Sequence, residues 1–148
     1  MTVVYDATAL ISWMSSEVGA DEVHDLISER GGRCSAVNLA EVIDCLSRSG
    51  RSTPERIVAT ITDLKTVGFG VEPCGFTLGA RAGVLRATHY SRSTQPVSLA
   101  DCIALATAEH LGATLVTSDA GLVAMAVSAG VDVHPIPNSS GVRPAVSP

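Results

Sequence analysis

Two acidic residues follow segments of this chain that have the apolar pattern of β-strands. Asp6 comes directly after the apolar run 3–5, and Asp119 follows the segment 115–118 near the other end of the chain. In an open α/β sheet, ligands bind outside the carboxyl ends of parallel strands. Two carboxylates at such ends are therefore expected to meet at one cleft. If further acids converge there, a divalent cation is the partner that offsets their mutual repulsion.

Two more acids are candidates for this cleft. Glu41 stands three residues after Asn38, and Asp101 stands three residues after Ser98. This spacing matches a capping box, in which the acid bonds the backbone of the cap residue, so both acids also have a purely structural interpretation. The setting of Asp101 favours a site, because the segment 99–108 is almost wholly apolar and contains no Lys or Arg. A buried, ionised carboxylate needs a partner, and a metal ion would be one.

The strand-end acids have structural alternatives as well. Asp6 could cap the helix that follows it, and Asp119 could be an ordinary turn or cap residue. Thr8 could bond the Asp6 carboxylate or a ligand, or it could face solvent. Asp44 lies one helical turn after Glu41 and is assigned to a solvated helix face, outside the site.

Composition predicts one globular domain with little capacity for broad nucleic-acid binding. The 148 residues are 46% hydrophobic and 17% charged, with two Phe, two Tyr and one Trp. A core of Val, Leu, Ile and Ala is expected, and platforms for stacking single-stranded bases are nearly absent. The net charge is −5. Any contact with nucleic acid must therefore be local, made by a few Arg residues with the help of bound metal.

The cysteines and the apolar segments bear on the compartment. The four Cys include no CxxC pair and no His at ligand spacing, which argues against a zinc site and favours reduced thiols in a cytoplasmic protein. No signal-peptide pattern opens the chain, and no apolar run approaches the length of a membrane span. We therefore expect no membrane association.

Strands and helices alternate along the chain, which predicts an α/β fold with a parallel sheet and helices on both faces. The expected strands are 2–6, 34–37, 71–73, 114–117 and 131–134, and the expected helices are 7–14, 20–30, 38–49, 54–67, 76–89, 98–111 and 120–129. Residues 1–135 are expected to form one domain. The tail 136–148 is rich in Pro and lacks apolar periodicity, so it is expected to be disordered.

Four segments occur in a familiar order, and each sits on the expected strand or helix. They are the strand ending in Asp6-Ala-Thr-Ala-Leu, then Val37-Asn-Leu-Ala-Glu41-Val, then Val97-Ser-Leu-Ala-Asp101-Cys-Ile-Ala-Leu, and finally Ala113-Thr-Leu-Val-Thr-Ser-Asp119. Together they resemble the PIN-domain nucleases and, more narrowly, the VapC toxins of bacterial toxin–antitoxin pairs. The resemblance covers residues 2–134. It implies a three-layer α/β/α PIN-like fold around a mostly parallel sheet of four to five strands.

The resemblance also implies an activity and a set of partners. The acids Asp6, Glu41, Asp101 and Asp119 match the catalytic, metal-binding quartet of a Mg²⁺- or Mn²⁺-dependent endoribonuclease, and Thr117 matches a Thr or Ser near the site. Because Mg²⁺ takes only one or two carboxylates directly, Asp6 and Asp101 are expected nearest the ion. An RNA substrate, a VapB-like antitoxin whose C-terminal segment reaches the acidic cleft, and a homodimer are implied as well.

Two other classes of function fit parts of this pattern. A PIN-like protein-binding module with little or no nuclease activity is favoured by the scarcity of basic residues, while the complete acidic quartet argues against it. A phosphatase or phospho-accepting receiver also carries Asp at strand ends. Asp6-Ala-Thr lacks the second acid of a DxD signature, and Lys65, the sole lysine, lies within a predicted helix, so this third class is rejected.

Overall fold

The structure is a computed structural model that describes residues 2–147. Its centre is a sheet of five strands in the order β3-β2-β1-β4-β5, with every neighbouring pair parallel. The strands are β1 (Val3–Tyr5), β2 (Gly32–Ser35), β3 (Phe69–Glu72), β4 (Thr114–Thr117) and β5 (Val133–Pro135). This confirms the predicted fold class, with all five strands parallel.

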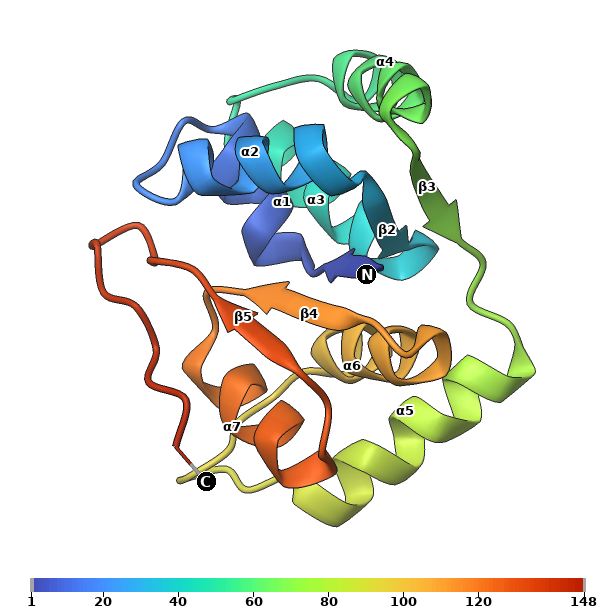
Figure 1. The fold of residues 1–148 in the computed structure, drawn as a ribbon, viewed down its shortest axis with the longest axis vertical. Helices are drawn as coiled ribbons and strands as arrows, with labels where there is room; N and C mark the ends of the chain where they lie inside the picture. Colours follow the sequence, from blue (N-terminus) through green and yellow to red (C-terminus); the bar gives the residue numbers. More distant parts are fainter. Residues whose placement is uncertain (1, 148) are drawn as a thin grey trace.

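Helices cover both faces of the sheet (Figure 1). One face is covered by α1 (Ala7–Met14), α2 (Ala20–Arg30), α3 (Ala36–Arg48) and α4 (Pro54–Asp63), with the short 3-10 helix η1 (Leu64–Val67) after α4. The other face is covered by α5 (Phe76–His89), α6 (Leu99–Leu111) and α7 (Ala120–Ala129). Each face has its own apolar cluster, so the sheet separates two cores. Within residues 2–147, no helix is long and apolar enough to cross a membrane.

Several helix ends follow the predicted chemistry. Thr53 caps α4 with Pro54 at its first position, and Ser98 caps α6. Gly112 and Gly130 end α6 and α7 in the left-handed conformation, with φ of 58° and 71°. These ends are set by local hydrogen bonding, which explains why the sequence predicts them well.

The second strand and its helix begin earlier than predicted. Strand β2 starts at Gly32 and not at Cys34, and α3 starts at Ala36, capped by the Ser35 hydroxyl and not by Asn38. Gly32 has φ of 129°, and a Cβ there would lie 2.6 Å from the ring of Tyr5. The strand therefore begins with a residue that must be glycine, which the pattern of apolar residues does not reveal.

After β5 the chain stays in contact with the domain. Ile136 is fully buried in the cluster beneath α1 and α2, and Arg143 donates to Glu22 of α2 at 2.8 Å. Glu22 also bonds His134 of β5 at 2.6 Å. The composition of the segment did not predict these contacts. The boundary after residue 135 and the disorder of residues 136–148 stay predictions.

Candidate active site

Asp6 lies at the carboxyl end of β1 and is 1% exposed. It caps α1, accepting the backbone N–H of Ala9 at 2.9 Å. Two hydroxyls also donate to its carboxylate, that of Thr8 at 2.8 Å and that of Thr117. Burial raises the pKa of Asp6 to about 7, although these three hydrogen bonds act in the opposite direction. Asp6 is therefore both a cap and a buried acid that is costly to ionise.

Asp119 lies just beyond the neighbouring strand β4, whose Val116 is paired with Tyr5 of β1. Its carboxylate caps α7 by accepting the N–H of Leu122 at 2.7 Å. Its own N–H donates to the Thr117 hydroxyl at 3.0 Å, and this hydroxyl bonds Asp6. Thr117 therefore connects the two strand-end acids. Asp119 is thus the cap of α7, and the carboxyl ends of β1 and β4 also lie next to each other, as the sequence predicts.

Asp101 stands in the first turn of α6 and forms the predicted capping box with Ser98. The Ser98 N–H donates to Asp101 Oδ2 at 2.8 Å, and the Asp101 N–H donates to Ser98 Oγ at 3.1 Å. The residue is partly exposed, which corrects the expectation that it is buried in its helix. The helix start protrudes, with Leu99 56% exposed. Desolvation still raises the pKa of Asp101, and the charge of Asp119 adds to this.

Glu41 lies in the second turn of α3, too far from Ser35 to form a capping box. Its Oε2 is buried and has no hydrogen-bond partner among the described residues. Burial raises the pKa of Glu41, and the charge of Asp101 raises it further, while a hydrogen bond with Asn38 lowers it. Asn38 also donates from Nδ2 to the carbonyl of Ala100 at 3.2 Å, which fastens α3 to the start of α6. The structural interpretation of Glu41 as a cap residue is therefore wrong.

The four acids form one electrostatic group. The charge of Asp101 raises the pKa of Asp6 and of Glu41, and that of Asp119 raises the pKa of Asp101. The ion pairs found among residues 2–147 involve none of the four. By contrast, Asp44 is exposed and bidentate to Arg48, as its assignment to a solvated face predicted. The group lacks a positive partner within the described chain.

The chemistry of these donors fits a hard, hydrated cation. Within residues 2–147, no three His, Cys, Asp or Glu side chains lie close enough together to hold an ion jointly. Mg²⁺ commonly keeps several waters and takes one or two carboxylates directly, so it needs no such cage. The unpaired Oε2 of Glu41 and the second oxygen of Asp101, for which no hydrogen bond is found, are available to it. Zinc, which prefers a closed tetrahedral set, does not fit.

Sequence reasoning missed one member of this arrangement. Asn38 was expected to be a helix cap, but it is a fully buried residue that bonds Ser35, Ala100 and Glu41. The spacing from Asn38 to Glu41 matches a capping box, so the sequence indicated a cap and not this buried hydrogen-bonding role. Thr8 and Thr117, which were expected near the site, both bond Asp6.

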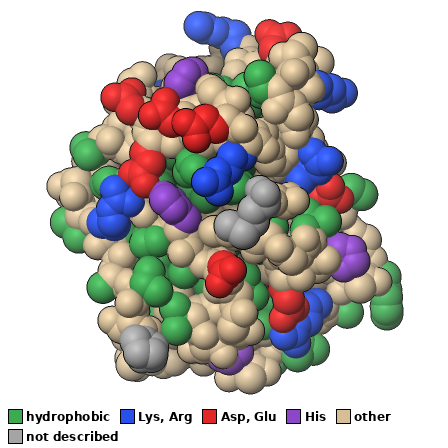
Figure 2. Space-filling view, viewed as in Figure 1, with side chains coloured by type: hydrophobic (Ala, Val, Ile, Leu, Met, Phe, Trp, Pro, Cys, Tyr) green, Lys and Arg blue, Asp and Glu red, His purple; other side chains and the backbone are tan. Residues whose placement is uncertain are grey.

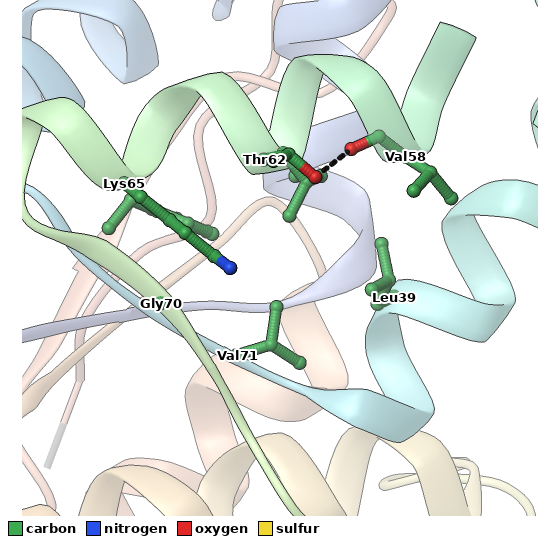
Figure 3. A pocket seen from close by; sticks show the side chains of 8 residues that line it. Leu39, Val58, Thr62, Lys65, Gly70 and Val71 are labelled. Carbon is green, nitrogen blue, oxygen red and sulfur yellow. Dashed lines mark hydrogen bonds between the residues drawn. The ribbon is translucent and has the colours of Figure 1, made fainter. Parts of the chain in front are cut away.

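A separate hollow of about 280 Å³ lies between α4, η1 and the edge strand β3 (Figure 3). Its walls include Leu39, Val58 and Val71, and the side chain of Lys65 extends over it. No carboxylate, His or Cys lines it. Lys65 is the one ionisable group among its lining residues, so the hollow offers no metal ligand and no acid–base pair, and the acids remain the candidate active site.

The five-stranded parallel sheet with acids at its carboxyl edge defines a known class of protein. A model of the PIN domain family matches residues 3–127, and the chain belongs to that family. No curated protein is similar enough in sequence to count as a relative.

Several solved structures share this fold, and VapC toxins and VapBC complexes are among them. VapC20 of Mycobacterium tuberculosis, described as a sarcin-ricin loop cleaving toxin, superposes with a TM-score of 0.68 at 18% identity, covering 97% of this chain and 100% of that one. DNA-bound VapBC of Salmonella typhimurium gives 0.63 at 19% identity, covering 90% and 97%. VapBC-1 of nontypeable Haemophilus influenzae gives 0.64 at 18% identity, covering 90% and 97%. At these identities the likeness shows a shared fold.

Proposed function

We propose that this protein is the toxin of a VapBC-type toxin–antitoxin pair and acts as a Mg²⁺- or Mn²⁺-dependent endoribonuclease. The observation that carries the proposal is the group formed by Asp6, Glu41, Asp101 and Asp119. Three of these acids have a raised pKa, and no Lys or Arg among the described residues forms an ion pair with the group. A protein seldom retains such uncompensated carboxylates unless a cation or a reaction uses them.

The side chains have separable tasks in this proposal. A divalent cation, when bound, would lower the pKa of a water molecule and offset charge that develops on the phosphate. Asp101 and Asp6 would hold it, and Thr8 and Thr117 keep the Asp6 carboxylate in one orientation. The unpaired Glu41 Oε2 can accept a proton from a nearby water or orient that water. Asp119 would act through water.

The partners follow from the same likeness. Because the similar VapBC structures are toxin–antitoxin complexes, we propose a VapB-like antitoxin that places a basic side chain at the acidic group. RNA is the proposed substrate, a homodimer the proposed assembly, and the cytoplasm the proposed compartment. The face shown in Figure 2 carries acidic and basic side chains without a broad basic area. Because the net charge of the chain is −5, contact with RNA would depend on bound cations and on a few Arg residues.

The test is cleavage of RNA by the purified protein in Mg²⁺ or Mn²⁺. Wild type is compared with Asp6→Asn and Asp101→Asn, with Asp44→Asn as the matched acid outside the group. The proposal predicts metal-dependent cleavage that both site variants lose and that Asp44→Asn keeps. Undiminished cleavage by both site variants would show that the chemistry lies elsewhere.

A protein-binding module with little or no nuclease activity is the second candidate. It is favoured by the absence of a preformed three-ligand metal site within residues 2–147 and by the net charge of −5. Titration calorimetry with Mn²⁺ separates the two candidates. Heat of binding at millimolar Mn²⁺ that disappears in Asp101→Asn supports the nuclease, whereas no binding in the wild type supports the module.

A further inference from the structure

A second hollow, of about 320 Å³, opens between the end of α1 and the start of α4. We call it the Trp13 pocket. It is lined by Trp13, Met14, Arg51, Ser52, Arg56 and Thr60, together with the buried Ile57. Trp13 is the sole tryptophan of the chain, and its side chain packs against the apolar core on one side. The pocket thus combines a flat aromatic wall, two guanidinium groups and two hydroxyls.

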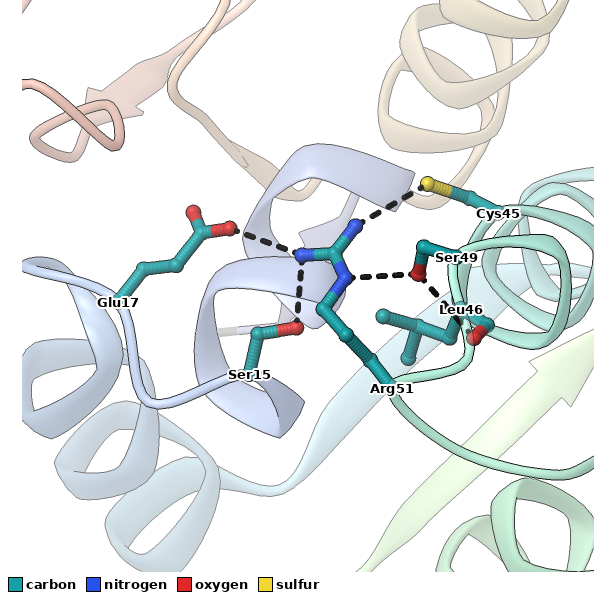
Figure 4. A network of polar contacts seen from close by, with 6 residues as sticks. All are labelled: Ser15, Glu17, Cys45, Leu46, Ser49 and Arg51. Atoms are coloured by element: carbon teal, nitrogen blue, oxygen red, sulfur yellow. Dashed lines mark hydrogen bonds and ion pairs between the residues drawn. The ribbon is translucent and has the colours of Figure 1, made fainter.

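Arg51 lines the Trp13 pocket and is held by a network of polar contacts, which Figure 4 shows. Its guanidinium donates to the hydroxyls of Ser49 at 2.8 Å and Ser15 at 3.1 Å, to Glu17 at 3.3 Å, and to the Cys45 sulfur at 3.6 Å. These partners come from the turn after α1 and from α3, so Arg51 bridges the two helices. A side chain held by so many bonds has little entropy left to lose when a ligand binds.

Arg56 is the free cation of the Trp13 pocket. It is exposed, and its side chain makes no ion pair or hydrogen bond within residues 2–147. In the cap of α4, the backbone N–H of Arg56 donates to the Thr53 hydroxyl, and the Arg56 side chain takes no part. Because Arg51 is already paired with Glu17, Arg56 supplies the uncompensated positive charge of the pocket.

The Trp13 pocket is connected to two of the four acids through α1 and α3. Asp6 caps the start of α1, and Trp13 stands at its end, a helix length of about 12 Å. On α3, Glu41 and Cys45 are four residues apart and so share one face, and Cys45 contacts the Arg51 guanidinium. A single-stranded RNA that lay along α1 and α3 would reach from these acids to the pocket within a few nucleotides.

We propose that the Trp13 pocket binds one nucleotide of the RNA substrate at a distance from the cleaved bond. The base would lie against the Trp13 indole, and the phosphate would be bound by Arg56 beside the fixed Arg51. Aromatic faces stack on bases of any sequence, and Arg with hydroxyl groups is the usual partner of phosphate oxygens. A simple anion would not need the apolar wall. This subsite rests on the proposed ribonuclease function. It would give the RNA a local point of contact on a protein whose net charge is negative.

The test uses the fluorescence of Trp13, which reports on this pocket alone. The purified protein is titrated with a single-stranded RNA hexamer in EDTA, which stops metal-dependent cleavage, at several salt concentrations. The variant is Arg56→Ala, which retains the Thr53 cap because that bond uses the backbone. Its control is Arg30→Ala, an exposed arginine at the end of α2, next to the amino end of β2 and outside the pocket lining. An acidic peptide hexamer serves as a competing ligand.

The proposal predicts that RNA changes the Trp13 emission, that Arg56→Ala weakens binding about fivefold, and that it lowers the salt slope by about 0.7. Arg30→Ala should bind like wild type. Equal binding by both variants, or an emission that RNA leaves unchanged, would overturn the subsite. Response to the acidic peptide but not to RNA would show a protein-binding pocket instead. Because binding is measured without cleavage, failure of the subsite is distinct from failure of the nuclease assignment.

Discussion

The substitution Asp6→Asn should stabilise the metal-free protein at alkaline pH. Asp6 is buried, and its pKa is raised from 3.8 to about 7. Its ionisation therefore opposes folding by up to about 4 kcal/mol, at 1.36 kcal/mol for each pKa unit. Asn keeps the oxygen that accepts the Ala9 N–H and is an equally good cap. The substitution removes the charge with little change to the cap.

The stability gained by Asp6→Asn should increase with pH. A carboxyl with a raised pKa in the folded state costs nothing below its unfolded pKa, and the cost grows as pH rises from about 4 to about 7. If local solvation halves this ionisation cost of about 4 kcal/mol, Asp6→Asn raises the free energy of unfolding by about 2 kcal/mol at pH 8. This corresponds to a rise in Tm of about 4–8 °C. The gain should be nearly absent at pH 4.

Thermal unfolding followed by circular dichroism in EDTA, at pH 4 and pH 8, measures both values. Asp44→Asn is the control, because that carboxylate is exposed and paired with Arg48. A loss of stability in Asp6→Asn that is equal at both pH values would refute the reasoning. It would mean that Asp6 acts only as a cap and that its burial carries no ionisation cost.

Three further outcomes are expected. Ser98→Ala should lower the free energy of unfolding by about 1 kcal/mol in a denaturant titration, because α6 loses its cap, and an unchanged midpoint would contradict the capping box. Mg²⁺ should raise the Tm more at pH 8 than at pH 5, since protons compete for Asp6, Glu41 and Asp101; an equal shift would contradict metal binding by these acids. Glu22→Gln should speed amide hydrogen exchange in residues 136–147 while changing global stability by less than about 1 kcal/mol, and unchanged exchange would show that its bond to Arg143 does not hold the tail.

Much of the fold could be predicted because its signals are local. The strand β1 and the caps at Thr53, Ser98 and Gly112 depend on residues that are adjacent in sequence. The start of β2 could not be predicted, since Gly32 is required by the ring of Tyr5, far away in the chain. Contacts across such distances carry no periodic signal along the sequence.

The candidate site shows the same division. The meeting of Asp6 and Asp119 follows from parallel strands that end at one edge of the sheet. The partial exposure of Asp101 and the burial of Asn38 depend on how α3 and α6 pack, which a single helix pattern does not encode. Capping and catalysis use the same residue types at the same helix starts. Local sequence therefore could not separate them, and the structure shows that one carboxylate can serve as a cap and still belong to the acidic group.

The most direct test of the central claim compares two acids on α3. Glu41, a member of the acidic group, has a buried oxygen without a hydrogen-bond partner in residues 2–147, whereas Asp44, about one turn further along, is exposed and paired with Arg48. The rate of Mn²⁺-dependent RNA cleavage is measured for Glu41→Gln and Asp44→Asn, with folding of both checked by circular dichroism. Glu41→Gln should lose about 100-fold or more, and Asp44→Asn should match wild type. Equal rates for the two variants, or cleavage that persists without metal, would contradict the assignment of these carboxylates to a metal-dependent nuclease.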